Sequence, residues 1–323
     1  MIFSKDALQA ACRLVHAHIP PTPLHNWPQL SALVGTELWV KHENHVPTGA
    51  FKVRGGITFI DWLRRHHPDY TGIITATRGN HGQSQARAAS AVGLKAVIYV
   101  PRGNSVEKNT AMRAYGADLR EFGDDFDEAR EEAQRVATDE GLFFVPSFHL
   151  ELVRGVASYA MEMFTARPDL DKVYVPIGCG SGICGVIAAR DALNLRTRII
   201  GVAAARAPTT VLSRQAGRMI ATETARSFAD GLAVRVPVPE AFAIYAKGAE
   251  DIITVSEDEI AEAVRHYYRA THNLAEGAGA AALAGALKQK DQLAGLRVGV
   301  VLSGANIDAP WMSTLLSGGT PAV

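Results

Sequence analysis

Hydrophobic and polar positions alternate along this chain in two ways. Short apolar runs such as KVYVPIG at 172–178 are typical of buried strands, and longer stretches with apolar residues every three or four positions are typical of helices. Between residues 72 and 148 the two patterns take turns, with strands expected at 72–77, 95–100, near 119 and at 142–145, and helices at 80–92, 105–115 and 124–139. Such alternation predicts a parallel sheet with right-handed crossovers.

The same alternation returns on both sides of this block. Strands are expected at 36–41, 172–178, 198–204, 251–255 and 297–303, and helices at 5–18, 50–65, 155–164, 183–193, 210–216, 256–270 and 278–287. Three prolines predict an extended segment at 19–24, and the weakly patterned stretch 217–247 is interpreted as a loop with uncertain helix content. The chain is therefore predicted to be a two-lobed α/β protein, each lobe an open, mostly parallel sheet flanked by helices. Residues 1–70 and 149–323 would form a large cofactor-binding domain, and residues 71–148 a small mobile substrate domain.

Composition limits the classes of partner. The chain has 323 residues, 47% hydrophobic and 20% charged, which is enough for two domains with a substantial core. Because 33 basic residues balance 33 acidic ones, there is no net field to attract nucleic acid or an anionic membrane surface. An anionic ligand would have to be held by local groups.

The cysteines and the apolar runs indicate the compartment. Three cysteines cannot build a disulfide framework, and the opening MIFSKD lacks the apolar core of a signal peptide. No apolar run approaches the roughly 18 residues of a membrane helix. The expectation is a cytoplasmic protein that has no membrane partner.

A lysine at the start of a predicted helix is the first candidate for chemistry. Lys52 lies in PTGAFKVRGG at 47–56, just inside the helix expected from residue 50. Backbone N–H groups and the positive end of the helix dipole disfavour the ammonium form there, so the amine can act as a nucleophile. An isolated lysine of this kind is more often solvated. The motifs that follow favour the reactive interpretation.

The sequence GCGSGICG at 178–185 follows the strongest buried strand and opens a helix. Glycines allow several N–H groups to converge on an anion, so this stretch predicts a phosphate site, with a tight turn as the alternative. Gly180, Gly182 and Gly185 also match the dinucleotide pattern G-x-G-x-x-G, which expects an acidic residue at the end of the next strand. That strand is followed by Arg206, so only an NADP-binding variant stays open.

Two further motifs lie at the ends of predicted strands. TRGNHGQ at 77–83 combines N–H groups of a helix start with an amide and a histidine, which suits a carboxylate or a phenolic oxygen. LSGAN at 302–306 ends the last strand, where open parallel sheets place their ligand crevice.

Together, the TGAFKVRGG, RGNHGQ, GCGSGICG and LSGAN motifs, in this order and at these spacings, resemble the fold type II, tryptophan-synthase-β-like pyridoxal phosphate enzymes, and most closely serine/threonine dehydratases and serine racemases. The resemblance implies that Lys52 holds the cofactor covalently and moves the α-proton. It implies cofactor contacts from Phe51, Asn80, Gly178, Cys179, Gly180, Ser181, Gly182, Glu276 and Ser303. Among these, Asn80 would bind the 3′-oxygen, residues 178–182 the phosphate and Ser303 the pyridine nitrogen. Substrate contacts are implied for Thr77, Arg78, Gly79 and His81.

This sequence departs from the family pattern at two places. Arg78 stands where relatives usually have Ser or Ala, and a Ser there serves racemases as an acid, so the departure argues against racemisation. Ala203 and Thr209 occupy positions that are acidic in many cation-binding relatives. Cys179 and Cys184 have no neighbouring Cys or His in the sequence. No metal is therefore expected.

These observations predict a dehydratase that removes water and ammonia from a small β-hydroxy-α-amino acid, acting as a homodimer. Arg78, expected to be partly buried beside the reacting carbons, offers a fork of donors to a second carboxylate, and serine or threonine would leave its guanidinium unpaired. For this reason 3-hydroxyaspartate is favoured over serine or threonine. The alternatives are a pyridoxal-phosphate-dependent β-replacement enzyme, an amino acid racemase and, from another class, an NADP-dependent oxidoreductase.

Overall fold

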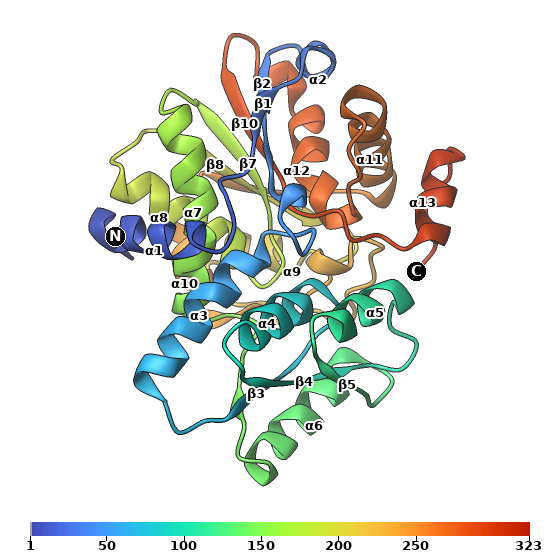
Figure 1. Cartoon of the computed structure of the whole chain (residues 1–323). Helices are drawn as coiled ribbons and strands as arrows, with labels where there is room; N and C mark the ends of the chain where they lie inside the picture. Colours follow the sequence, from blue (N-terminus) through green and yellow to red (C-terminus); the bar gives the residue numbers. More distant parts are fainter. Residues whose placement is uncertain (1) are drawn as a thin grey trace.

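The computed structural model describes residues 2–323, which fold around two β-sheets (Figure 1). The larger sheet has the strand order β1-β2-β10-β7-β8-β9; only the edge strand β1 pairs antiparallel among the described residues. Its strands are β1 (Leu24–Asn26), β2 (Glu37–His42), β7 (Lys172–Pro176), β8 (Arg198–Ala204), β9 (Asp251–Val255) and β10 (Arg297–Leu302). The carboxyl ends of β2, β10 and β7 therefore lie side by side.

The smaller sheet has the strand order β5-β4-β3-β6, and its pairs are parallel. Its strands are β3 (Gly72–Ala76), β4 (Lys95–Val100), β5 (Asp118–Glu121) and β6 (Phe143–Phe144). The predicted α/β architecture with two mostly parallel sheets is confirmed. The boundaries of the two domains and the mobility of the smaller one stay predictions.

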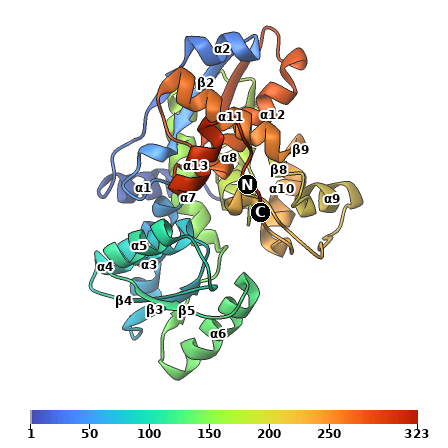
Figure 2. The same ribbon diagram turned by 90° about the vertical axis from the view of Figure 1, so that its right-hand side faces the viewer.

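Helices cover both faces of each sheet (Figures 1 and 2). Helices α11, α12 and α13 pack with α2 on one face of the larger sheet, and α7, α8 and α10 pack on the other. Helices α3, α4 and α5 cover one face of the smaller sheet, and α6 covers the opposite face. The bounds are α1 (Lys5–His16), α2 (Pro28–Val34), α3 (Lys52–His66), α4 (Asn80–Ser90), α5 (Val106–Ala114), α6 (Phe126–Asp139), α7 (Leu150–Ala166), α8 (Ser181–Ala192), α9 (Thr209–Ala216), α10 (Pro239–Gly248), α11 (Glu257–Thr271), α12 (Gly277–Lys288) and α13 (Ala309–Leu316), with 3-10 turns η1 (Glu43–His45), η2 (Asp230–Leu232) and η3 (Lys290–Gln292).

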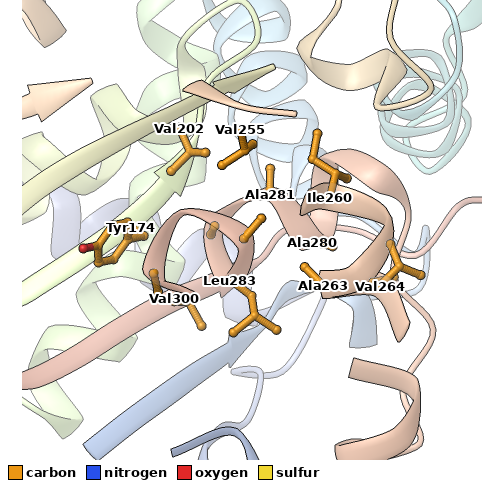
Figure 3. Close-up of a cluster of buried hydrophobic side chains, with 14 of the residues drawn as sticks. Tyr174, Val202, Val255, Ile260, Ala263, Val264, Ala280, Ala281, Leu283 and Val300 are labelled. Carbon is orange, nitrogen blue, oxygen red and sulfur yellow. The ribbon is translucent and has the colours of Figure 1, made fainter. Parts of the chain in front are cut away.

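The small-residue helix α12 packs directly on the larger sheet. Ala280, Ala281 and Leu283 lie in a buried cluster with Tyr174 and Val300 of the sheet (Figure 3). Because these alanines are small, the helix axis can approach the strands closely. The backbone N–H of the residue before α12 also donates to the Gly304 carbonyl at 3.1 Å, which fixes the start of α12 beside the end of β10.

Helices α3 and α7 cross at two glycines. A Cβ on Gly55 would lie 2.7 Å from the Leu152 carbonyl oxygen, and a Cβ on Gly155 would overlap the Arg54 carbonyl. Only glycine allows so close a crossing. This crossing sets the position of α3, which begins at Lys52.

Several elements differ from the sequence prediction. Helices α2 and α13 and strand β1 were not predicted; β1 begins at Leu24, where the predicted extended segment ends, and α10 begins in the stretch interpreted as a loop. Helix α7 begins at Leu150, five residues before the predicted start, because the His149 side chain caps it. Pro28 and Pro239 stand at the first positions of α2 and α10, a placement that favours helix starts and could have revealed both.

Within residues 2–323, no helix is both long enough and apolar enough to cross a membrane.

Candidate active site

The predicted motifs meet at the carboxyl end of the larger sheet, next to the smaller one. Lys52 is the first residue of α3, and the turn before it is tied to the chain that follows β10. The Phe51 N–H donates to the Ser303 carbonyl at 3.1 Å, and Ala50 forms an isolated bridge with Gly304. The motif containing Lys52 and the motif containing Ser303 are therefore one structural unit.

The environment of the Lys52 amine makes it less basic than an exposed lysine. The side chain is half-buried, and its Nζ lies 4.6 Å from the centroid of the Phe51 ring. Burial lowers the pKa of Lys52 below its ordinary value, although the nearby Glu276 and, more weakly, Cys179 act in the opposite direction. A lysine with a lowered pKa can act as a nucleophile and as a base.

A buried ion network anchors the helix that carries Lys52. The Arg54 guanidinium is fully buried and pairs with Glu43 at 2.6 Å and with Glu162 of α7 at 2.6 Å. Lys41 of β2 adds a 2.5 Å ion pair to Glu162. Removing one partner would leave an unpaired buried charge, so the network holds α3, α7 and β2 in register. Sequence reasoning did not find it, because its members are far apart in the chain.

The loop 178–182 forms a cradle between β7 and α8. Gly180 has φ 101°, in the left-handed region, and precedes Ser181, the first residue of α8. A Cβ on Gly178 would overlap the Gly231 carbonyl oxygen, and the Tyr159 hydroxyl donates to the Gly182 carbonyl at 3.2 Å. The first N–H groups of α8 have no intrahelical partner and carry the positive end of its dipole. The loop can therefore bind a phosphate without a basic side chain.

Cys179 lies in the same loop and faces the lysine. Burial raises the pKa of the Cys179 thiol, while Lys52 and the Ser147 side chain lower it. Residues 178–182, Phe51 and Lys52 are thus brought together, since a Cβ on Gly182 would lie 3.5 Å from the Phe51 ring.

The loop 77–81 begins α4 on the smaller sheet. The Thr77 hydroxyl accepts from the Gly79 N–H at 2.9 Å, which shapes the turn. His81 is buried, and burial followed by the nearby Lys52 lowers its pKa to about 3. Its Nε2 has no hydrogen-bond partner within residues 2–323, so it can accept from a ligand only in the neutral form.

The exposure of the Arg78 side chain differs from the expectation. It was expected as a partly buried side chain beside the reacting carbons, but it is exposed. The residue lines a cavity of about 390 Å³ together with Lys108, Asp230, Glu276 and Asn306. Because water solvates an exposed guanidinium, leaving it unpaired carries little penalty.

A polar chain connects Asn80 to the larger sheet. The Asn80 Nδ2 donates to Glu276 at 2.5 Å, and the Asn306 Nδ2 donates to the Asn80 Oδ1 at 2.7 Å. Lys108 of α5 lies 2.5 Å from Asp230 and 3.5 Å from Glu276. Burial raises the pKa of Glu276, an effect that Lys108 opposes. The sequence analysis gave Lys108, Asp230 and Asn306 no role, although Asn306 belongs to the LSGAN motif.

These residues fit pyridoxal phosphate. The glycine cradle suits the phosphate of this cofactor, and the Lys52 amine suits its aldehyde. The second hydrogen of the Asn80 amide can bind its 3′-oxygen, and the buried Ser303 hydroxyl can bind its ring nitrogen. The Ser303 hydroxyl makes only a long 3.4 Å contact with the Ala278 carbonyl, so it can reorient toward a ligand.

Ala203 and Thr209 lie away from any carboxylate cluster. Ala203 is buried in β8, and the Thr209 hydroxyl donates to the Ile220 carbonyl at 2.5 Å. Within the described residues 2–323, no group of three or more His, Cys, Asp or Glu side chains is arranged to hold a metal. The absence of a metal in the working protein stays a prediction.

Comparisons with known proteins agree with the geometry. Over 98% of its length, the chain is 34% identical to "L-threonine ammonia-lyase" of Thermotoga maritima, of which it covers 77%. The structure matches maize serine racemase with a TM-score of 0.91 and 25% identity, covering 98% of both chains. It also matches the processed form of threonine deaminase isoform 2 from Solanum lycopersicum with a TM-score of 0.89 and 28% identity, covering 98% of this chain and 94% of that one.

The model of the family described as "Pyridoxal-phosphate dependent enzyme" matches residues 15–304, nearly the whole chain. With the lysine, the glycine cradle and the Ser303 hydroxyl gathered at one sheet edge, the chain belongs to the family of pyridoxal-phosphate-dependent enzymes.

Proposed function

We propose that this protein is a dehydratase that converts a β-hydroxy-α-amino acid to a 2-oxo acid and ammonia. The proposal rests on the Lys52 amine, whose pKa is lowered by burial. Lys52 follows Phe51, whose N–H donates to the Ser303 carbonyl and whose ring lies beside Gly182 of the 178–182 cradle. The proposal is supported by relatives named L-threonine ammonia-lyase and threonine deaminase. An NADP-dependent oxidoreductase is no longer an alternative, because the family match includes residues 178–185.

The side chains of this protein divide the work of the reaction. When bound, pyridoxal phosphate supplies the electron sink that makes the α-proton of an amino acid removable. Lys52 takes that proton, and backbone N–H groups of the 77–81 loop, including that of His81, hold the α-carboxylate. The β-hydroxyl leaves as water with a proton returned from the Lys52 ammonium, and water then hydrolyses the released enamine to the 2-oxo acid and ammonia. Because the Ser303 hydroxyl is a poor acid, it would leave the ring nitrogen of the bound cofactor unprotonated, which would favour elimination over transamination.

The substrate has two candidates. Serine or threonine is supported by the names of the relatives. A 3-hydroxyaspartate is supported by the exposed guanidinium of Arg78 in the cavity wall, where a second carboxylate could bind; Lys108 in the same wall is already paired with Asp230 and Glu276. The exposure of Arg78 weakens the original argument that an unpaired guanidinium disfavours serine.

A substrate panel tests the function. The enzyme loaded with pyridoxal phosphate would be given the stereoisomers of serine, threonine and 3-hydroxyaspartate, and ammonia and 2-oxo acid would be measured. We expect turnover with at least one of them, and loss of turnover in Lys52→Ala with the apoprotein still folded. Lys95→Ala is the matched control, because Lys95 is exposed and pairs only with surface carboxylates. Normal turnover in Lys52→Ala would contradict the proposal.

Arg78→Ala tests the choice of substrate. If Arg78 binds a second carboxylate, the substitution should reduce transition-state binding of 3-hydroxyaspartate by about 1.5–3 kcal/mol, with a much smaller loss for serine. The measurement is kcat/KM for both substrates. Equal losses would show that Arg78 supports the loop and does not select the side chain.

β-Replacement and racemisation are the two alternative activities for this protein within the family. Racemisation is suggested by the similarity to maize serine racemase and opposed by Arg78. β-Replacement would be detected as product formation from an added thiol nucleophile. Racemisation would be detected as conversion of one serine enantiomer into the other.

The homodimer and the cytoplasmic location also remain proposals. The three cysteines are free in the described part of the chain, which suits a reducing compartment. Light scattering of the purified enzyme would establish the oligomeric state.

A further inference from the structure

Lys108 connects the two sheets through a single buried side chain. It lies on α5, beside the smaller sheet, and only 5% of its surface is exposed. Its ammonium pairs with Asp230 of η2 at 2.5 Å and lies 3.5 Å from Glu276, the residue that precedes α12. Both carboxylates belong to segments packed against the larger sheet. The ion pairs therefore cross from one half of the molecule to the other.

The stem of Lys108 lies against the substrate loop. A Cβ built on Gly79 would overlap the Lys108 Cδ and would lie 3.2 Å from its Cγ. The loop backbone therefore packs directly on this aliphatic chain. Gly79 stands between Thr77, whose hydroxyl accepts its N–H, and Asn80, which donates to Glu276. Moving the stem would move the loop that carries these groups.

The head of Lys108 stabilises the charge on which Asn80 depends. Glu276 is buried, and a buried carboxylate is favoured only when a cation or donors compensate for lost hydration. Lys108 is a cation within ion-pair distance of Glu276, and the Asn80 amide is a donor to it. Asp230 and Glu276 together raise the pKa of Lys108 above its ordinary value despite burial, so the side chain stays charged.

The same helix carries two further contacts to the opposite half. The Ser105 hydroxyl donates to Asp308 at 2.5 Å, and the Glu107 carboxylate accepts from the Ala309 N–H at 3.0 Å. Ser105, Asp308 and Lys108 all line the cavity. Among these contacts, that of Lys108 also reaches Gly79 of the substrate loop and Glu276.

We propose that Lys108 is a positioning residue for the reaction: its stem fixes the substrate loop through Gly79, and its ammonium ties that loop to the carboxylates beside the Asn80 amide. Its part in catalysis rests on the proposed function, whereas its hold on the loop does not.

Hydrogen exchange tests the hold on the loop without any turnover. Lys108→Met keeps an unbranched apolar stem and removes the charge. In the apoprotein, we expect amide exchange in the 77–82 segment to become about tenfold faster, because the loop loses its tie to Asp230 and Glu276. Lys95→Met, on the same half of the molecule, is the control and should leave this segment unchanged. Unchanged exchange in Lys108→Met would overturn the proposal.

Kinetics of the loaded enzyme test the second half of the proposal. Lys108→Met should keep the absorbance of the bound cofactor, because Lys52 and the cradle are intact, while KM for the hydroxyamino acid rises about 10- to 100-fold. Lys108→Arg, which keeps the charge, should recover part of the loss. A variant with normal KM and reduced kcat alone would overturn the positioning role.

A second variant, and the exchange experiment itself, distinguish failure of the Lys108 proposal from failure of the proposed function. If Lys108→Met fails to fold, Asp230→Asn removes the same ion pair from the opposite half, and exchange in the 77–82 segment should again increase; an unchanged rate would overturn the proposal. If the wild-type enzyme turns over no hydroxyamino acid, the proposed function fails, and the exchange experiment still decides whether Lys108 holds the loop.

Discussion

Single side chains set the chemistry of this site by the charge they carry. Burial makes Lys52 less basic. Ser303 offers a buried hydroxyl at a position where a carboxylate would favour protonation of the cofactor's ring nitrogen. Neither effect needs a large movement of the backbone. Both can therefore be tested by substitutions that keep the fold.

Ser303→Asp would place a carboxylate at the ring nitrogen. An opposite charge in contact should raise the pKa of that nitrogen by about 1–3, so the ring would be protonated near neutral pH. We expect a shift of the cofactor absorbance and slower elimination, measured by ammonia release. Ser303→Ala is the control, because it removes the hydroxyl without adding charge. Identical spectra and rates in the Asp variant would mean that Ser303 does not lie at the ring.

At the scale of elements, the 178–182 cradle depends on backbone space. Gly178 has the Gly231 carbonyl where a Cβ would be, whereas a Cβ on Gly182 would make an ordinary 3.5 Å contact with Phe51. Gly178→Ala should therefore displace the loop and weaken cofactor binding by about 1–3 kcal/mol, and Gly182→Ala should weaken it less. Equilibrium dialysis of the apoproteins with pyridoxal phosphate measures both. Equal affinity in the two variants would contradict a steric origin.

Elements with a strong period were predictable from the sequence, and those stabilised by tertiary contacts were not. The strand expected at 172–178 appears as β7 (Lys172–Pro176), and the helix expected at 256–270 appears as α11, which begins with a capping box formed by Ser256 and Glu259. Helices α2 and α13 are only 7 and 8 residues long, too short for a helical period to stand out. They form because Leu30 and Leu315 reach a core assembled from distant segments.

In the candidate site, too, groups that depend on tertiary contacts were not predictable from the sequence. The motifs supplied the groups that fit a cofactor, because a glycine loop or a helix-start lysine has a local physical reason. The supporting partners of these groups had no such signal. The contact of Lys108 with Asp230, or of Arg54 with Glu162, joins residues that only the folded chain brings together.

At the scale of the whole molecule, a buried neutral histidine predicts sensitivity to acid. The Trp27 indole N–H donates to the His42 Nε2 at 2.9 Å, which requires an unprotonated ring nitrogen. Burial, followed by the charge of His45, lowers the pKa of His42 to about 3. As the pH falls, the unfolded chain takes up this proton first. The stabilising contribution is therefore fully present above pH 6.5, the ordinary value, and is lost as the pH falls toward the folded value.

This loss should amount to about 2 kcal/mol between pH 6.5 and 5 for His42, with a similar contribution from His81. Chemical denaturation at several pH values would measure it. His42→Gln should remove about half of the pH dependence in this window, because His81 still contributes, and His25→Gln, at an exposed neighbouring ring, should leave it unchanged. An unchanged slope in His42→Gln would show that its proton is not involved.

Closure of the two halves is the remaining property of the whole molecule. Contacts such as Ser105 with Asp308 and Ala309 with Glu107 join the smaller-sheet region to the larger one near the rim of the cavity. Polar contacts at a rim are individually weak, so ligand binding can shift their equilibrium. Because the 77–81 loop belongs to the smaller sheet, an α-carboxylate bound to it should draw the halves together and exclude water from the reacting carbon. We expect X-ray scattering of the loaded enzyme to show a smaller radius of gyration when an unreactive substrate analogue is added.

Ser105→Ala should make the analogue-free enzyme more open by removing one rim contact, while leaving the analogue able to close it. A radius that stays the same with and without a bound analogue would show that the loop acts on a rigid frame, and the lid role of residues 71–148 would then be wrong.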